Sequence, residues 1–277
     1  MLFIIGLIKL IFLKPSQPNS NLILFFIAFI AVVIIFLLTH RNNYLTKAFP
    51  NSNLPALSFI FSWAVFVVLV SSIRGFANID ESFILSAAYR ISQGEVPYRD
   101  FFYNVTPLTI YFQAVIFKIF GFNLIFTKYY IAIVNGVFSV LIFWLLNRWL
   151  GTRLALFLAL ISSVWFYSIL GTPWYDQDSY LMILLGIVFL TSYFFTHKNE
   201  KLKLLTAGIF FGLSFLGKQN LGLVSIILGS LVTYGFVYYK DRKIINFKIL
   251  IFALGVFFPI GLLRACRPIS LVASLCL

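Results

Sequence analysis

Carboxylates are scarce in this 277-residue chain, and most of them lie close together. Of eight acidic residues, six fall in two short polar segments between apolar runs: Asp80, Glu81, Glu95, Asp100, Asp176 and Asp178. Glu200 and Asp241 lie instead among lysines and arginines. A water-exposed loop is a sufficient explanation for Glu95, but the clustering of the other five indicates a shared role. A group of carboxylates at one surface is suited to general acid–base chemistry.

The composition places these acids in a membrane protein. Hydrophobic residues make up 61% of the chain and charged residues only 10%, whereas a soluble domain is about a quarter charged. The mean hydropathy is +1.00, and several apolar runs reach the roughly 18 to 20 residues that a helix needs to cross a bilayer. Most runs are apolar on every side and do not alternate as barrel strands do. We therefore expect an all-α fold, a polytopic transmembrane helix bundle.

Eight apolar runs are candidate crossings: Leu22–Thr39, Leu54–Ile73, Leu124–Leu146, Leu154–Leu170, Tyr180–Phe195, Leu202–Leu216, Leu221–Tyr239 and Ile249–Leu263. A further run, Leu108–Phe120, is short and is interrupted by Lys118. We expect it to form a short helix that lies at the outer surface or enters the membrane only in part. Gly208 and Gly212 have the spacing that lets two membrane helices approach closely.

The basic loops predict the orientation. Lysines and arginines in the loops near residues 41–47, 148–153, 198–203 and 240–248 are assigned to the cytoplasm, where short loops retain positive charge. The acidic segments 74–106 and 171–178, and the turn at 218–220, then face the non-cytoplasmic side of the cell membrane. The same loops explain the net charge of +13. Because the basic residues are scattered rather than gathered on one stripe, nucleic acid is not an expected partner.

Residues 80–93 form the element that should position the first acids. Apolar residues recur there at helical spacing, which predicts an amphipathic juxtamembrane helix lying on the membrane, after the second or third hydrophobic segment. Asn78 with Glu81 is suited to capping the start of this helix, and Gly94 to ending it. Asp80 then lies at a helix start on the lipid–water boundary. A carboxylate there suits a general base that meets a lipid-borne and a polar substrate together.

Three stretches resemble the GT-C glycosyltransferases, most closely the group of protein mannosyltransferases and aminoarabinose transferases. The first is DESFILSAAYRISQGEVPYRD (80–100), followed by Pro107-Leu108 and Phe120-Gly121, which is similar to the first outer loop of that group. The second is DQDSYL (176–181), and the third is AGIFFGLSFLGK (207–218), a glycine-containing helix that ends in lysine. The resemblance covers roughly residues 54–225.

The resemblance implies transfer of a sugar from a polyprenyl-phosphate-linked donor to a hydroxyl of a lipid, glycan or protein acceptor, with inversion at the anomeric carbon. The loop acids of the family fall on Asp80, the expected base, and on Glu81. Asp178 matches the second family acid.

Cations must hold the lipid phosphate as it leaves, and Arg99, Lys218 and Arg74 are the candidates. A snorkelling helix end explains Lys218 equally well. Asp176 and Asp100 are candidates for acceptor or metal contacts. Some relatives use a divalent cation and others use no metal, so the metal is left open.

The chain also departs from the family pattern. Some relatives carry Glu-Lys before the proline that opens the next helix, whereas Asn104, Val105 and Thr106 precede Pro107 here. Family members are longer, and residues 264–277 change character abruptly, which predicts a truncated or frameshifted chain with doubtful activity. We divide the chain into N-terminal hydrophobic segments and a cytoplasmic loop (1–53), a GT-C-like module (54–263) and this tail.

The alternative function is that of a polytopic transporter or lipid flippase without glycosyl transfer. Such proteins place ionisable groups within their spans and are built from repeated halves. The predicted spans carry almost no acids and show no internal repeat, so the pattern favours the enzyme.

Overall fold

The computed structural model describes residues 54–72, 79–166, 172–196, 199–241 and 247–265. These residues form α-helices and contain no β-strand, which confirms the predicted all-α bundle. In chain order the helices are α4 (Leu54–Ser72), α5 (Ile79–Ser92), α6 (Leu108–Phe120), α7 (Leu124–Leu150), α8 (Thr152–Phe166), α9 (Tyr175–Phe195), α10 (Glu200–Gly217), α11 (Gln219–Asp241) and α12 (Phe247–Ala265).

Four of the described helices are long and apolar enough to cross a membrane: α4, α7, α9 and the segment Gln219–Tyr239 of α11. The chain is therefore a multi-pass membrane protein. Helices α8, α10 and α12 form where crossings were predicted, and their passage through the membrane stays a prediction, as does the orientation. The predicted span Leu22–Thr39 and the tail 264–277 lie outside the described residues, except for the last two residues of α12.

Two predicted boundaries need correction. Helix α9 begins at Tyr175 and not at Tyr180, so Asp176 and Asp178 lie in its first turn rather than in a preceding loop. Helix α11 begins at Gln219, which leaves Lys218 as the single residue between α10 and α11. Both shifts have the same cause: polar residues at the end of a membrane helix extend it past the limit of its apolar run.

One compact unit contains α4, α7 and α8. Its core gathers Ile60 of α4, Phe143 of α7, and Ala155 and Ala159 of α8. Asn135 of α7 is completely buried, and its amide nitrogen donates hydrogen bonds to the carbonyl oxygens of Ala64 (2.9 Å) and Ser163 (3.0 Å). A single side chain thus joins three helices, as polar residues do between membrane helices.

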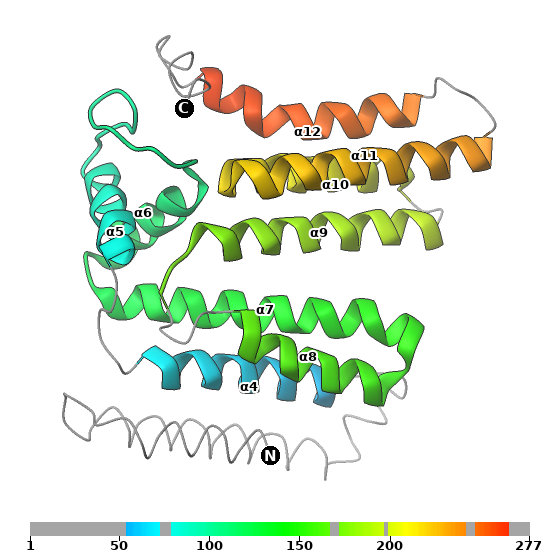
Figure 1. The fold of residues 1–277 in the computed structure, drawn as a ribbon, viewed down its shortest axis with the longest axis horizontal. Coiled ribbons are helices and arrows are strands. Elements are labelled where there is room, and N and C mark those ends of the chain that lie inside the picture. The colour runs from blue at the N-terminus through cyan, green and yellow to red at the C-terminus, as the bar shows by residue number, and fades with distance from the viewer. Residues whose placement is uncertain (1–53, 73–78, 167–171, 197–198, 242–246, 266–277) are drawn as a thin grey trace. The chain divides into compact units, whose positions relative to one another are not determined.

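The second unit contains α5, α6 and the helices α9–α12. Helices α9, α10, α11 and α12 lie side by side (Figure 1), with α10 in contact with the other three. Predicted close packing at Gly208 and Gly212 is confirmed, because a Cβ atom on either would lie 2.3 Å from a carbonyl oxygen of α12, that of Phe252 or Val256. Gly255 of α12 meets the Leu205 carbonyl oxygen of α10 in the same way.

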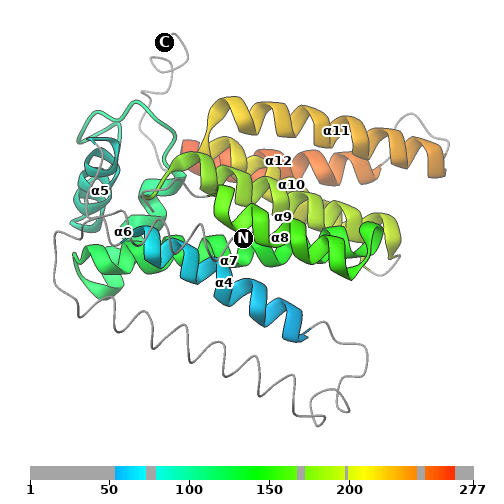
Figure 2. The same cartoon turned by 60° about the horizontal axis from the view of Figure 1, so that its bottom comes forward.

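Helices α5 and α6 form a pair within this unit, beside the end of the bundle at which α9 begins (Figures 1 and 2). Helix α5 confirms the helix predicted for residues 80–93, and Gly94 follows it with a φ of 98°. The two helices enclose a core of Ile84, Ala87, Tyr103 and Ile110. Helix α6 spans Leu108–Phe120 as predicted and also contacts α9 and α10.

We expect Gly212→Ala to destabilise the protein, because its Cβ would overlap the α12 backbone and overpacking costs about 1–3 kcal/mol. Gly235→Ala is the matched control, since a Cβ at this glycine of α11 meets no described atom within 4 Å. Thermal unfolding in detergent should show a lower midpoint for Gly212→Ala and an unchanged or higher one for Gly235→Ala. Equal midpoints would contradict the close approach of α10 and α12.

Candidate active site

An ion pair joins the start of α9 to the end of α10. The ammonium group of Lys218 lies 2.5 Å from Oδ1 of Asp176, and the indole nitrogen of Trp174 donates a hydrogen bond of 3.1 Å to Oδ2 of the same carboxylate. Lys218 also lies over the ring of Tyr175, 5.3 Å from its centroid. Both side chains of the pair are partly exposed, 34% for Lys218 and 24% for Asp176. The site therefore holds an oriented cation that solvent can reach.

The backbone explains why Lys218 is placed there. Helix α10 ends at Gly217, and Lys218 is extended, with φ −148° and ψ 121°. Its amide nitrogen donates a hydrogen bond to the Ser214 carbonyl (3.0 Å). Its own carbonyl accepts a hydrogen bond from the Gly222 amide (2.8 Å), and this bond belongs to the first turn of α11. With the main chain used in this way, the lysine side chain is directed out of both helices.

Side-chain hydrogen bonds fasten three segments around this junction. Ser179 of α9 donates to the Ser214 carbonyl of α10 (2.8 Å), and Thr106 donates to the Gly217 carbonyl (2.7 Å). A Cβ on Gly217 would lie 3.0 Å from that of Ser179, so the two helices touch there. Thr106 ends the loop between α5 and α6, and this loop is thereby attached next to Lys218.

Two further acids are buried in the same unit. Asp178, 1% exposed, lies two residues after Asp176 in the first turn of α9, where the partial positive charge of the helix start favours a carboxylate. Glu81 of α5 is 0% exposed and shares the buried helix face with Ile84, Leu85 and Ala88. The sequence predicted a role at the helix start for Glu81, and its burial was not expected.

The loop between α5 and α6 has its own charges. Arg99 binds Asp100 through two hydrogen bonds of 2.8 Å, and the Val96 amide donates to the same carboxylate (2.8 Å). Arg90 of α5 pairs with Glu95 at 2.5 Å and lies 4.4 Å from the centroid of the Phe101 ring. The hydrogen bond from Arg99, followed by that from the Val96 amide, lowers the pKa of Asp100 to about 2.

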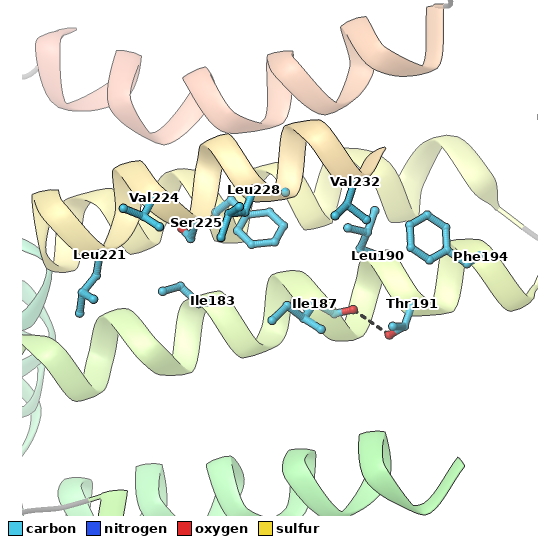
Figure 3. Close-up of a pocket in the computed structure, with 12 residues that line it drawn as sticks. Ile183, Ile187, Leu190, Thr191, Phe194, Leu221, Val224, Ser225, Leu228 and Val232 are labelled. Carbon is cyan, nitrogen blue, oxygen red and sulfur yellow. Dashed lines mark hydrogen bonds between the residues drawn. The ribbon is translucent and has the colours of Figure 1, made fainter. Parts of the chain in front are cut away.

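An apolar groove runs along α9 and α11 (Figure 3). Its volume is about 470 Å³. It starts at Leu221, three residues after Lys218, and reaches Val232, which is about 16 Å further at a rise of roughly 1.5 Å per residue. Its polar residues, Thr191 and Ser225, donate their hydroxyl protons to the carbonyl groups of their own helices. The groove thus offers an apolar wall to a ligand.

Comparison with protein families shows which family the chain belongs to. Residues 104–262, more than half of the chain, match the model of the dolichyl-phosphate-mannose-protein mannosyltransferase family. The chain belongs to this family. It is accordingly a membrane glycosyltransferase of the GT-C type, and the family implies a lipid-linked sugar as the donor. No curated protein and no solved structure shows significant similarity to the chain.

The family match includes Asp176, Asp178 and Lys218, whereas the candidates between residues 74 and 100 precede it. Asp80 lies in the first turn of α5, but the position of its side chain is outside the described part of the chain, as is the whole of Arg74. The structure brings Asp176 together with Lys218 and Arg99 together with Asp100. The catalytic roles of Asp80, Glu81 and Asp178 stay predictions.

Several residues of the site were missed in the sequence. Trp174 and Tyr175 contact the ion pair, and an aromatic pair directly before two acids is a signal that was available.

Tyr103 is 2% exposed in the core of the α5–α6 pair. Burial, followed by the neighbouring hydroxyls of Tyr98 and Tyr175, raises the pKa of Tyr103, so its hydroxyl group stays protonated. The Thr106 bond had no sequence signal, since 111 positions separate its partners.

The suitability of Asp176 as a metal ligand can be judged from its contacts. Both of its oxygens are already engaged, one by Lys218 and one by Trp174. Within the residues described, no group of three His, Cys, Asp or Glu side chains lies close enough to hold an ion. A metal ion at Asp176 would have to displace the ammonium group of Lys218. The carboxylate is therefore better suited to holding this lysine in place than to binding a metal.

The low pKa of Asp100 can be tested by titration. With carboxyl-labelled aspartate, the NMR signal of Asp100 should titrate with a midpoint of about 2. Because the folded-state pKa is depressed, the bridge stabilises the loop fully above the ordinary pKa of about 4 and loses this effect as the pH falls towards 2. Arg99→Gln should move the midpoint up towards 3.8, the unperturbed value. A midpoint that does not respond to Arg99→Gln would assign the shift to another cause.

Proposed function

We propose that the protein transfers a sugar from a polyprenyl phosphate to an acceptor hydroxyl on the non-cytoplasmic face of the cell membrane, with inversion. Asp80 takes the hydroxyl proton, and the acceptor oxygen forms a bond to the anomeric carbon. The bond from that carbon to the phosphate oxygen breaks, and polyprenyl phosphate leaves with the electron pair. Attack from the side opposite to the leaving group inverts the configuration in a single displacement.

The observation that carries the proposal is the fixed cation at Lys218 beside an apolar groove. A leaving phosphate gains negative charge during the reaction, and an oriented ammonium group stabilises that charge more than water does. Lys218 is oriented by a carboxylate and an aromatic ring, and it is accessible. Arg99 is the second proposed contact and Arg74 the third, both on the outer segment that precedes α6.

The groove supports a donor with a long apolar chain. It starts less than one helical turn from Lys218 and continues along the membrane-spanning part of α9 and α11. Most of its wall consists of aliphatic and aromatic side chains, and the hydroxyl groups of Thr191 and Ser225 are bonded to carbonyl groups of their own helices (Figure 3). A phosphate at Lys218 and an isoprenoid chain in the groove therefore fit one amphiphilic molecule.

The position of α5 supports Asp80 as the base. Helix α5 packs on α6, and α6 contacts the two helices that carry Asp176 and Lys218. The outer loop between α5 and α6 is tied to Gly217 through Thr106. Asp80 thus lies in the first turn of a helix that belongs to the same packed unit as the proposed phosphate site. Asp178 is proposed to orient the acceptor from the first turn of α9.

A transporter or flippase is not favoured. The family is defined by glycosyl transfer, and five of the proposed site residues lie at the ends of helices or in the outer loop: Asp80, Arg99, Asp176, Asp178 and Lys218. A translocation path would need ionisable groups near the middle of spans. The described spans carry none of the proposed groups at such a position.

Asp80→Asn tests the proton transfer. Transfer of sugar from a polyprenyl-phosphate donor to an acceptor is measured with the purified 277-residue chain in lipid nanodiscs. Because the amide accepts no proton, kcat should fall by about 10²–10⁴-fold. Glu95→Gln, which alters an acid of the Arg90 pair outside the proposed site, should keep its activity. Full turnover of Asp80→Asn would exclude the base assignment.

Leu228→Trp tests the groove as the chain-binding site. Leu228 lines the groove and is 56% exposed, so a larger side chain fits the fold but fills the groove. The KM for a long-chain donor should rise about tenfold or more, a loss of about 1.4 kcal/mol of binding, while a donor with a very short chain should be unaffected. Ile227→Trp is the control, since Ile227 is 50% exposed on the same helix and lies outside the groove. Equal effects of both changes would argue against chain binding there.

A further inference from the structure

We propose that Asp176 is a positioning residue that acts through Lys218, holding the ammonium group until the phosphate of the lipid donor replaces it. The inference rests on the proposed function, in which Lys218 binds that phosphate. It assigns Asp176 neither proton transfer nor metal binding. It gives the carboxylate a purpose in the reaction that follows from its two contacts and its exposure.

The contacts of Asp176 are those of an anchor. One oxygen lies 2.5 Å from the Lys218 ammonium, and the other accepts the Trp174 indole proton at 3.1 Å. Trp174 stacks on Tyr175, with ring centroids 5.2 Å apart, and Tyr175 lies under the ammonium group. Three successive residues, 174–176, therefore fix the position of a lysine whose aliphatic stem has several rotatable bonds.

Exposure distinguishes Asp176 from the acid next to it. Asp178 is 1% exposed, whereas the side chains of Asp176 and Lys218 keep 24% and 34% of their surface accessible. Lys218 is therefore open to an approaching anion along part of its side chain, although the Asp176 oxygen that binds it is buried. A fully buried pair would not permit this exchange, because removing one partner leaves an uncompensated charge.

The charge of the phosphate changes in the direction that favours the exchange. In the donor, the phosphate is a diester with one negative charge, which competes poorly with a carboxylate already in place. As the bond to the sugar breaks, the phosphate becomes a monoester with a charge of about −1.5 to −2 at pH 7. The gain for Lys218 is then larger in the transition state than in the bound donor, and only such a difference accelerates a reaction.

Asp176→Asn should therefore lower both the KM for the donor and kcat, each for a different reason. Without the competing anion the donor binds more tightly, so its KM should fall about three- to tenfold, while the unanchored lysine lowers kcat about tenfold or more. Trp174→Phe should change both constants in the same directions but less. A lost base would lower kcat with no gain in binding, and a lost metal ligand would make the remaining activity depend on added Mg²⁺ or Mn²⁺.

The double variant with Lys218→Met tests whether Asp176 acts through the lysine. In the Lys218→Met background, Asp176→Asn should have no further effect on kcat or KM, because two groups of one interaction are not additive. Glu200→Gln is the matched control. Glu200 pairs with Lys248 at 3.1 Å, and its side chain has a similar exposed fraction of 21%, but neither partner belongs to the site. It should leave both constants unchanged.

Binding of polyprenyl phosphate without a sugar separates this inference from the proposed function. Its affinity for the solubilised protein should rise in Asp176→Asn and fall in Lys218→Met. If the parent chain shows this binding pattern but transfers no sugar, the proposed function fails and the role of Asp176 stands. If sugar is transferred but the KM does not fall in Asp176→Asn, the inference is overturned while the function stands. The same holds if the effects of Asp176→Asn and Lys218→Met on kcat and KM multiply in the double variant.

Discussion

The close approach of α10 to its neighbours is the constraint on which the second unit depends. Lipid tails are as apolar as leucine, so membrane helices gain little from hydrophobic burial and associate through shape and polar contacts. Helix α10 meets this requirement with glycines: Gly208 and Gly212 admit the backbone of α12, and Gly217 admits Ser179 of α9. The residue after this last glycine is Lys218, so the packing of α10 also determines where the cation lies.

The charges of the site suit a position at a membrane boundary. A lysine without a partner would be expensive to keep close to hydrocarbon, and Asp176 removes that cost. The carboxylate in turn satisfies its second oxygen with the indole of Trp174. Tryptophan, with an apolar ring and a polar N–H, is a residue well suited to such a boundary.

Much of the fold could be predicted from the sequence, because a bilayer restricts the chain to long apolar helices. The helix at Asp80–Gln93, the short helix Leu108–Phe120 and the glycine pair in α10 were all correct. Boundaries were less accurate where polar residues extend a helix, as at Tyr175. An apolar run marks only the part of a helix that is suited to the membrane. A first turn made of polar residues has no hydropathy signal, so the sequence does not show where such a helix begins.

The sequence indicated which residues belong to the site, but it did not indicate which of them contact one another. Lys218 and Asp176 were recognised as candidates for different roles, and their pairing depends on the register of α9 against α10, which periodicity does not reveal. The burial of Glu81 was missed because a glutamate in a first turn usually faces water. The groove was also missed, since runs that are apolar on every side do not show which of their faces are left open.

The hydrogen bond from Thr106 to Gly217 has a consequence for the order in which the protein assembles. The two residues are 111 positions apart, and at about 5–20 residues per second a ribosome needs roughly 6–22 seconds to synthesise that interval. Helices α5 and α6 have their own core and are complete long before α10 exists. Helices α5 and α6 are therefore synthesised first, and α10, formed later, provides the carbonyl group to which their loop attaches.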